Sequence, residues 1–65
     1  MPDQPPSDVQ VLDLAAQGLS AHDIARRLGV EDRAVHNTVA RIRRRLGARS
    51  LDHAVQIHQT RKEQQ

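Results

Sequence analysis

The side chains best suited to recognise another molecule are concentrated in residues 31–47, which read EDRAVHNTVARIRRRLG. If this stretch forms a helix, one side of it carries base-edge donors and cations, with His36 and Arg41 on the flanks of that side. The residues on that side are Arg33, Asn37, Ala40 and Arg44. Arginine and asparagine donate hydrogen bonds to base edges in the major groove of DNA, and Asn37 can make a bidentate contact to adenine. The pattern favours a surface that reads DNA.

The opposite side of the same helix is apolar. Four aliphatic residues follow one another by four, three and four positions: Val35, Val39, Ile42 and Leu46. This spacing puts them on a single stripe, which we expect to pack on the rest of the domain. An ordinary amphipathic surface helix with a solvated arginine face has the same pattern, so the neighbouring segments decide between the two interpretations.

Positive charge is concentrated in the middle of the chain. The net charge is only +2, but residues 26–49 carry eight arginines against two acidic residues, whereas residues 1–25 carry four aspartates and no lysine or arginine. A basic block of this kind indicates a polyanionic partner. The chain contains no Phe, Tyr or Trp, and proteins usually bind single strands by stacking bases on aromatic rings. Double-stranded DNA is therefore the expected partner, with Arg26 and Arg27 as further contacts to its phosphates.

Composition and length exclude several classes of function. A chain of 65 residues forms one small domain with little room for a catalytic cleft, so we expect no enzyme. The chain has no cysteine to bind a metal, and its four histidines form no i, i+4 pair, so we expect neither a metal nor a cofactor. The sequence has no apolar run long enough to span a membrane and no signal peptide pattern at its start. These features predict a cytoplasmic protein associated with the nucleoid.

The chain divides into three parts: a disordered proline-rich lead-in at residues 1–6, a domain at 7–60 and a polar tail at 61–65. The first helix of the domain is predicted to have Pro6 in its first turn, with Ser7 and Asp8 satisfying its free amides, and to end at Gly18. Its apolar positions are Val9, Val11, Leu12, Leu14, Ala15 and Ala16.

Two helices joined by a tight glycine turn are predicted next. The shorter one, at residues 21–28, is capped by Ser20 and stopped by Gly29. The longer one, at about residues 32–46, starts where an acidic residue, Glu31 or Asp32, can cap it. A short helix, a tight turn and a longer helix with a polar outer face form the helix-turn-helix pattern, whose second helix enters the major groove.

A fourth helix is predicted over about residues 51–60, after Gly47 has ended the long helix and with Ser50 as its cap. Leu51, Ala54, Val55 and His58 share one side of it, and Ile57 points elsewhere. Four predicted helices indicate an all-α fold built around a helix-turn-helix.

With these helices in place, the chain resembles the LuxR-type (GerE-like) DNA-binding domain of bacterial transcription regulators. The resemblance covers about residues 6–58. It rests on the combination of LAAQGLSAHDIARRLGV at residues 14–30, V-x-N-x-V in the long helix, and RRRLGARSLDHAV at residues 43–55.

The resemblance implies a division of labour among the helices. Residues 21–28 would brace the DNA backbone and residues 32–46 would read bases, with family contacts falling on His36, Asn37 and Ala40. The last helix would form a homodimer that binds an inverted repeat, and the residues expected at that interface are Leu51, Ala54, Val55, Ile57 and His58. For the apolar ones the choice lies between the core of the protomer and the interface, and both can hold at once, with Ile57 serving the dimer because it lies off the stripe.

Several positions depart from the family pattern. Glu31 stands where the family usually has Ser or Thr, Ala34 where it has a phosphate-contacting Thr, and His36 where Lys is common. At the front, residues 4–8 lack the usual apolar anchor and capping hydroxyl. Family members also usually carry a receiver or ligand-binding domain ahead of this one. These departures motivate an alternative hypothesis, a small protein-binding modulator that holds a larger regulator or an RNA polymerase subunit.

Overall fold

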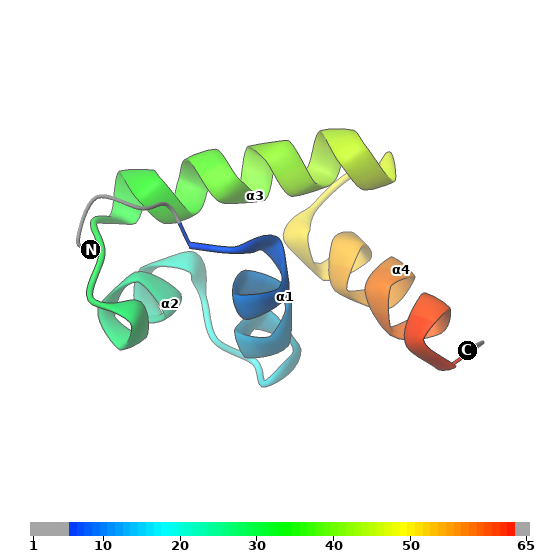
Figure 1. Cartoon of the computed structure of the whole chain (residues 1–65), viewed down its shortest axis with the longest axis horizontal. Coiled ribbons are helices and arrows are strands. Elements are labelled where there is room, and N and C mark those ends of the chain that lie inside the picture. Colours follow the sequence, from blue (N-terminus) through cyan, green and yellow to red (C-terminus); the bar gives the residue numbers. More distant parts are fainter. Residues whose placement is uncertain (1–5, 64–65) are drawn as a thin grey trace.

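A computed structural model describes residues 6–63, with side chains up to Arg61, and the elements in this part of the chain are helices (Figure 1). They are α1 (Asp8–Ala16), α2 (Ala21–Leu28), α3 (Asp32–Leu46) and α4 (Leu51–Glu63). The predicted all-α fold is confirmed, and α2 and α3 have the predicted bounds. Residues 1–5 and 64–65, on which most of the predicted lead-in and part of the predicted tail fall, lie outside the described residues.

The first helix begins with a reciprocal cap. The Ser7 hydroxyl accepts a hydrogen bond from the Gln10 backbone N–H at 3.1 Å, and the Gln10 side chain accepts one from the Ser7 N–H at 3.1 Å. Ser7 therefore supplies the capping hydroxyl that the comparison with the family pattern suggested was missing. Pro6 lies before the cap and is buried, so its predicted place in the first turn is wrong.

Glycines end the two helices of the helix-turn-helix as predicted. Gly29 and Gly47 have φ values of 71° and 67°, in the left-handed region that residues with a Cβ rarely occupy. Ser20 caps α2 through its hydroxyl, which accepts from the Asp23 N–H at 3.2 Å. The expected acidic cap of α3 is not formed, because Glu31 occupies the cap position without a side-chain hydrogen bond. Asp32 instead places its charge in the first turn of α3, where it opposes the positive end of the helix dipole.

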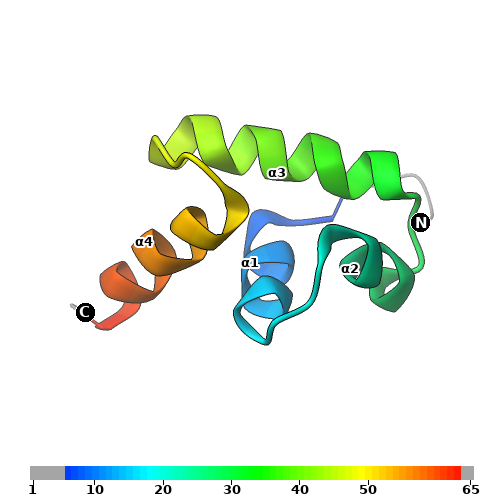
Figure 2. The same ribbon diagram turned by 180° about the vertical axis from the view of Figure 1, so that it is seen from behind.

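The core lies where α1 meets the other three helices. Figures 1 and 2 show α3 lying across α1 and α2, with α4 leaving at an angle from its C-terminal end. The buried apolar side chains are Val11, Leu12, Ile24, Ala25, Val35, Ile42, Ala54 and Val55. Every helix contributes to this set, so the underside of α3 is held by the whole domain rather than by one neighbour.

The buried side of α3 differs from the predicted apolar stripe at three positions. Val35 and Ile42 are fully buried, but Val39 and Leu46 are only partly buried, and Thr38 is buried completely. The Thr38 hydroxyl donates to the Ala34 carbonyl one turn earlier, at 3.0 Å, and lies 3.5 Å from the Pro6 carbonyl. Because the hydroxyl is satisfied within its own helix, a threonine can replace an aliphatic residue in the core.

Two edges of the fold also differ from expectation. Val9, predicted among the apolar positions of the first helix, is 56% exposed. Helix α4 continues to Glu63 rather than ending near Thr60, so the first residues of the predicted tail are helical. The added residues are good helix formers, and neither glycine nor proline stops the helix there.

Candidate nucleic-acid interface

The outer face of α3 is exposed where the sequence predicted it to be. Arg33, His36, Asn37, Ala40 and Arg44 all lie on the solvent side of the helix. The distance along the axis from the first to the last of them is about 16 Å at 1.5 Å per residue. The face therefore combines a central pair of hydrogen-bonding side chains with a cation toward each end, on a helix whose opposite side is fixed in the core.

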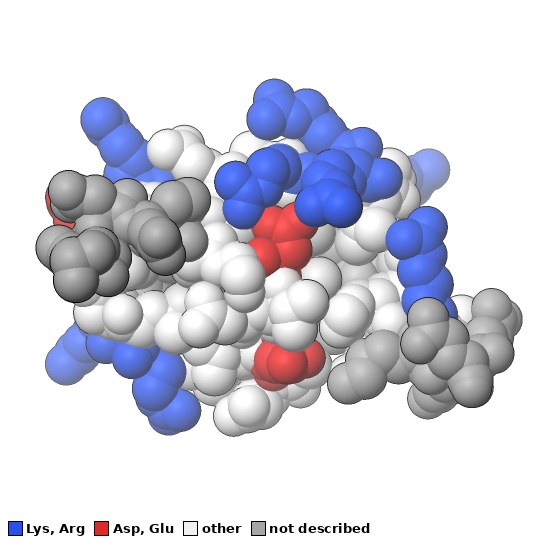
Figure 3. Space-filling model, in the orientation of Figure 1, with Lys and Arg blue, Asp and Glu red and all other residues white. Residues whose placement is uncertain are grey.

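Arg41 does not belong to this free face. Its Nη2 atom lies 2.7 Å and its Nε atom 3.2 Å from Asp8 Oδ1. Arg45 binds the other oxygen of the same carboxylate, with Nη1 at 2.8 Å from Asp8 Oδ2. The structure thus gives the predicted DNA ligand Arg41 a partner inside the protein, and Figure 3 shows the basic side chains gathered around an acidic group on this side of α3.

The aspartate is well placed to hold two arginines. Asp8 is in the first turn of α1, where the free backbone amides and the helix dipole favour a negative charge. Its side chain is 21% exposed, against 42% for Arg41 and 69% for Arg45. The three groups therefore tie the start of α1 to the side of α3, at a point that only the tertiary structure brings together.

A hollow at the end of α3 was not anticipated. Its lining residues are Ala40, Arg43, Arg44, Gly47 and Ala48. It is an open depression of about 450 Å³ lined by small residues and by two exposed arginines, whose charges suit a phosphate group. Arg43 was not among the predicted contacts, because helical spacing placed its neighbour Arg44, and not Arg43, opposite the apolar stripe. The signal was its position three residues after Ala40, which places it on the same face.

Helix α2 adds a second basic surface. Arg26 and Arg27 are exposed in its last turn, beside a shallow depression that Leu19 and Asp23 also line. A contact also links the N-terminal ends of the two helices of the motif, where His22 Nδ1 lies 2.9 Å from Asp32 Oδ2. Both predicted phosphate contacts on α2 are therefore accessible, on a helix that is fixed relative to α3.

The residues predicted for a dimer interface fall into two groups. Ala54 is fully buried and Val55 is 9% exposed, so both belong to the core of the protomer and offer almost no surface to a partner. Leu51, Ile57 and His58 are partly exposed. Ile57 also lines an open depression on α4, which leaves it as the apolar residue of the predicted set best placed to meet a second copy.

The described residues contain no group of three potential metal ligands among His, Cys, Asp and Glu. None of the helices in residues 6–63 is both long and apolar enough to cross a membrane.

Comparison with known families agrees with this geometry. The sequence matches the family GerE, described as bacterial regulatory proteins of the luxR family, over residues 6–58. Comparisons with curated proteins and with solved structures give no significant match. The match spans all of α1, α2 and α3 and most of α4, and the family is one of DNA-binding regulators rather than enzymes. The chain therefore belongs to the LuxR family of bacterial regulatory proteins and carries its helix-turn-helix DNA-binding domain.

Proposed function

We propose that the chain binds double-stranded DNA in a sequence-specific manner and regulates transcription by placing α3 in the major groove. The observation that carries this proposal is the exposure of Arg33, Asn37 and Arg44 on one face of α3, while Val35 and Ile42 bury the other. The major groove accepts a single α-helix, and helix-turn-helix proteins use the second helix of the motif in this way.

The contacts divide along the length of α3. Residues in the N-terminal half of such a helix contact base edges, so we assign base reading to Arg33, His36 and Asn37, together with Ala40, which lies just past the middle of α3 on the same face. Asn37 is the residue expected to recognise adenine. Arg43 and Arg44 sit beside the hollow at the end of α3 and would hold a phosphate of the DNA backbone.

The basic end of α2 supplies the remaining backbone contacts. We assign Arg26 and Arg27 to phosphates, because they are exposed in the last turn of α2, which is not the helix proposed to enter the groove. Arg41 is left out of the proposed contact set, since its guanidinium already binds Asp8. This function places the chain in the bacterial cytoplasm, on the nucleoid.

Selection of bound sites from random duplexes tests this proposal most directly. We expect an enriched motif whose affinity falls steeply between about 50 and 200 mM salt, because several phosphates are neutralised in the complex. The same titration with a scrambled duplex measures the non-specific component. If the chain were instead a protein-binding modulator, the selection would return no motif, and that result would contradict the proposal.

We further propose that the chain acts as a homodimer on an inverted repeat. Paired reading helices contact half-sites about 10 base pairs apart, and the exposed part of α4 around Ile57 would join the two copies. Sedimentation of Ile57→Asp tests this, with Gln59→Asp as the control because Gln59 is exposed on the same helix. We expect only Ile57→Asp to dissociate the dimer. A wild-type chain that stays monomeric on an inverted repeat would contradict the dimer but not DNA reading by α3.

A further inference from the structure

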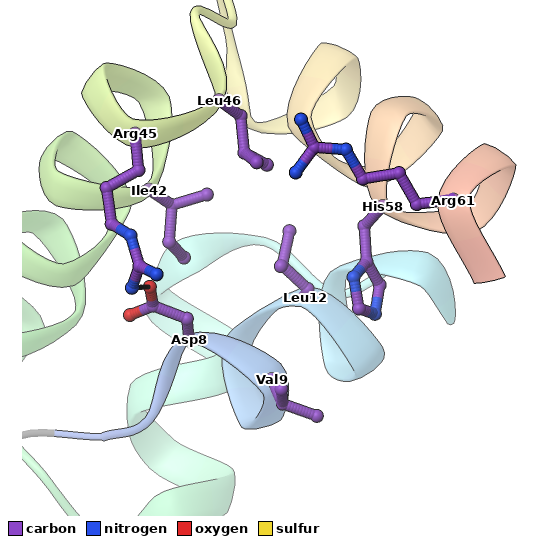
Figure 4. Close-up of a pocket in the computed structure, with 8 residues that line it drawn as sticks. All are labelled: Asp8, Val9, Leu12, Ile42, Arg45, Leu46, His58 and Arg61. Atoms are coloured by element: carbon purple, nitrogen blue, oxygen red, sulfur yellow. Dashed lines mark hydrogen bonds and ion pairs between the residues drawn. The ribbon is translucent and has the colours of Figure 1, made fainter.

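A second recessed surface lies away from the outer face of α3, between α1, the end of α3 and α4 (Figure 4). It is a groove of about 280 Å³ lined by Leu12, Ile42 and Leu46, of which only Leu46 is partly exposed, since Leu12 and Ile42 belong to the core. Val9 stands at its edge and is 56% exposed, as the large aliphatic side chain that the described part of the fold leaves most open. Covering Val9 and Leu46 would remove apolar surface from water, which favours a partner with an apolar group.

The rim of the groove is basic. Arg45 and Arg61 line it, and Figure 4 shows the Arg61 side chain on α4 facing Leu46 across the opening. The acidic group at the rim, Asp8, is already shared between Arg45 and Arg41. Among the described residues, no carboxylate lies within ion-pair distance of Arg61. A partner that brings a carboxylate would therefore find an arginine available across the opening from Leu46.

These two properties distinguish the groove from the DNA surface. A nucleic acid backbone would supply negative charge but no aliphatic group to cover Val9 and Leu46, whereas a polypeptide can supply both.

We propose that this groove docks a segment of another protein that presents one large apolar side chain beside a carboxylate. The apolar side chain would pack on Leu46 beside Val9, and the carboxylate would pair with Arg61. Because none of these residues belongs to the outer face of α3, the segment and DNA would bind at the same time. The inference does not depend on DNA reading by α3, but Arg61 also lines the depression around Ile57 that is proposed for the dimer.

Two short capped peptides serve as probes in a titration of the full chain with labelled methyl groups. One is the acidic acetyl-Asp-Leu-Leu-Asp amide, and the other is the basic acetyl-Lys-Leu-Leu-Lys amide. We expect the acidic peptide to shift the methyl resonances of Val9, Leu12 and Leu46 in a saturable way, with a dissociation constant of about 1 mM, as suits one small apolar contact and one exposed ion pair. The basic peptide should leave them unchanged.

Two matched variants distinguish the proposed ion pair between Arg61 and the peptide carboxylate from general attraction between opposite charges. Arg61→Glu should lower the affinity for the acidic peptide by about threefold or more, the value of one exposed ion pair. Arg33→Glu makes the same charge change on the DNA surface and should have no effect on the methyl shifts. Both residues are exposed, so both variants should keep the fold, and circular dichroism checks this.

Four outcomes would overturn the proposal. The first is the absence of methyl shifts up to about 10 mM acidic peptide, a concentration well above the expected dissociation constant. The second is equal binding of the two peptides, which would mean that charge plays no part. The third is an equal loss of affinity for the acidic peptide in Arg33→Glu and Arg61→Glu. The fourth is a concentration-dependent shift of the same methyl groups without peptide, which would mean that a second copy of the chain occupies the groove.

Discussion

Helix α3 carries arginines on two sides, and the two sides have different roles. Arg33 and Arg44 lie on the outer face, where their charges are open to solvent. Arg41 and Arg45 lie on the side facing α1, where both bind the carboxylate of Asp8. The chemistry of the side chains is the same, but the outer pair is available to a phosphate or a base, whereas the inner pair fastens α3 to the rest of the domain.

This difference shows that arginine content alone does not define a DNA contact. What separates the two sides is one aspartate, which is 33 residues from Arg41 in the sequence and within hydrogen-bonding distance of it in the fold. A residue whose charge is already satisfied positions the helix, and a residue whose charge is open can bind a partner. The variants below test that separation, beginning with the largest expected effect.

Replacement of Asn37 by alanine should lower the affinity for the selected DNA site by about 1–3 kcal/mol, because a bidentate base contact is lost. Binding to scrambled DNA should not change, and neither should the thermal unfolding midpoint, since Asn37 is exposed and alanine is the better helix former. Competition with sites substituted at each base pair measures the effect. An equal loss for selected and scrambled DNA would place Asn37 on the backbone rather than on a base.

Replacement of Arg44 by alanine should lower the affinity for all DNA sequences by the same factor. The slope of the logarithm of affinity against the logarithm of salt concentration should fall by about one unit, the amount expected for one phosphate contact. Arg45→Ala is the matched control on the neighbouring residue, because Arg45 binds Asp8 instead. If Arg45→Ala reduced the salt slope as much as Arg44→Ala, the inner side of α3 would also contact DNA, and the comparison between the two sides would fail.

Replacement of Asp8 by alanine should reduce the free energy of unfolding by roughly 1 kcal/mol or less, because the loss of two ion pairs is partly compensated by solvent around the exposed arginines. Base preference should stay the same. Urea unfolding measures the change, with Asp13→Ala as the control on the same helix, since the nearest basic atom to Asp13 is His58 Nε2 at 3.8 Å. A broadened base preference without a loss of stability would mean that the aspartate acts on DNA reading directly.

Replacement of His22 by alanine should have the smallest effect. The contact between His22 and Asp32 joins the two helices of the motif at 2.9 Å, but both side chains are at least half exposed. Surface pairs of this kind contribute about 0.5 kcal/mol or less to the free energy of unfolding. Denaturant unfolding and DNA titration together check this, and a loss of DNA affinity larger than the loss of stability would show that His22 itself meets the backbone.

The site could be predicted in part because its pattern is local. The exposure of Arg33, Asn37 and Ala40 follows from helical spacing. The ends of α2 and α3 follow from their glycines, because glycine readily adopts the left-handed backbone angles that end a helix. The surroundings of Arg41 and Arg43 could not be predicted from local spacing, for two different reasons. The first has a partner far away in the chain, and the second belongs to a hollow that exists only once α3 has ended and the chain has turned at Gly47.

On α4 the sequence left open whether Ala54 and Val55 serve the core of the protomer or a dimer interface. An apolar stripe shows that a helix face is covered, but it does not say whether the cover is the same chain or a second copy. In the structure α1 and α3 provide it, and both residues are in the core. The partly exposed Ile57, which the spacing placed off that stripe, is the residue left for a partner.

Signals within a few residues of one another predict that the chain forms four helices, where α3 begins and ends, and which face of α3 meets solvent, because capping, glycine conformation and helical periodicity act over that range. The packing of the helices settles which arginines stay free, which aliphatic residues remain exposed at Val9 and Ile57, and where the surface is hollowed. These properties depend on side chains that are distant in the chain and meet only when the helices pack, so no local pattern contains them.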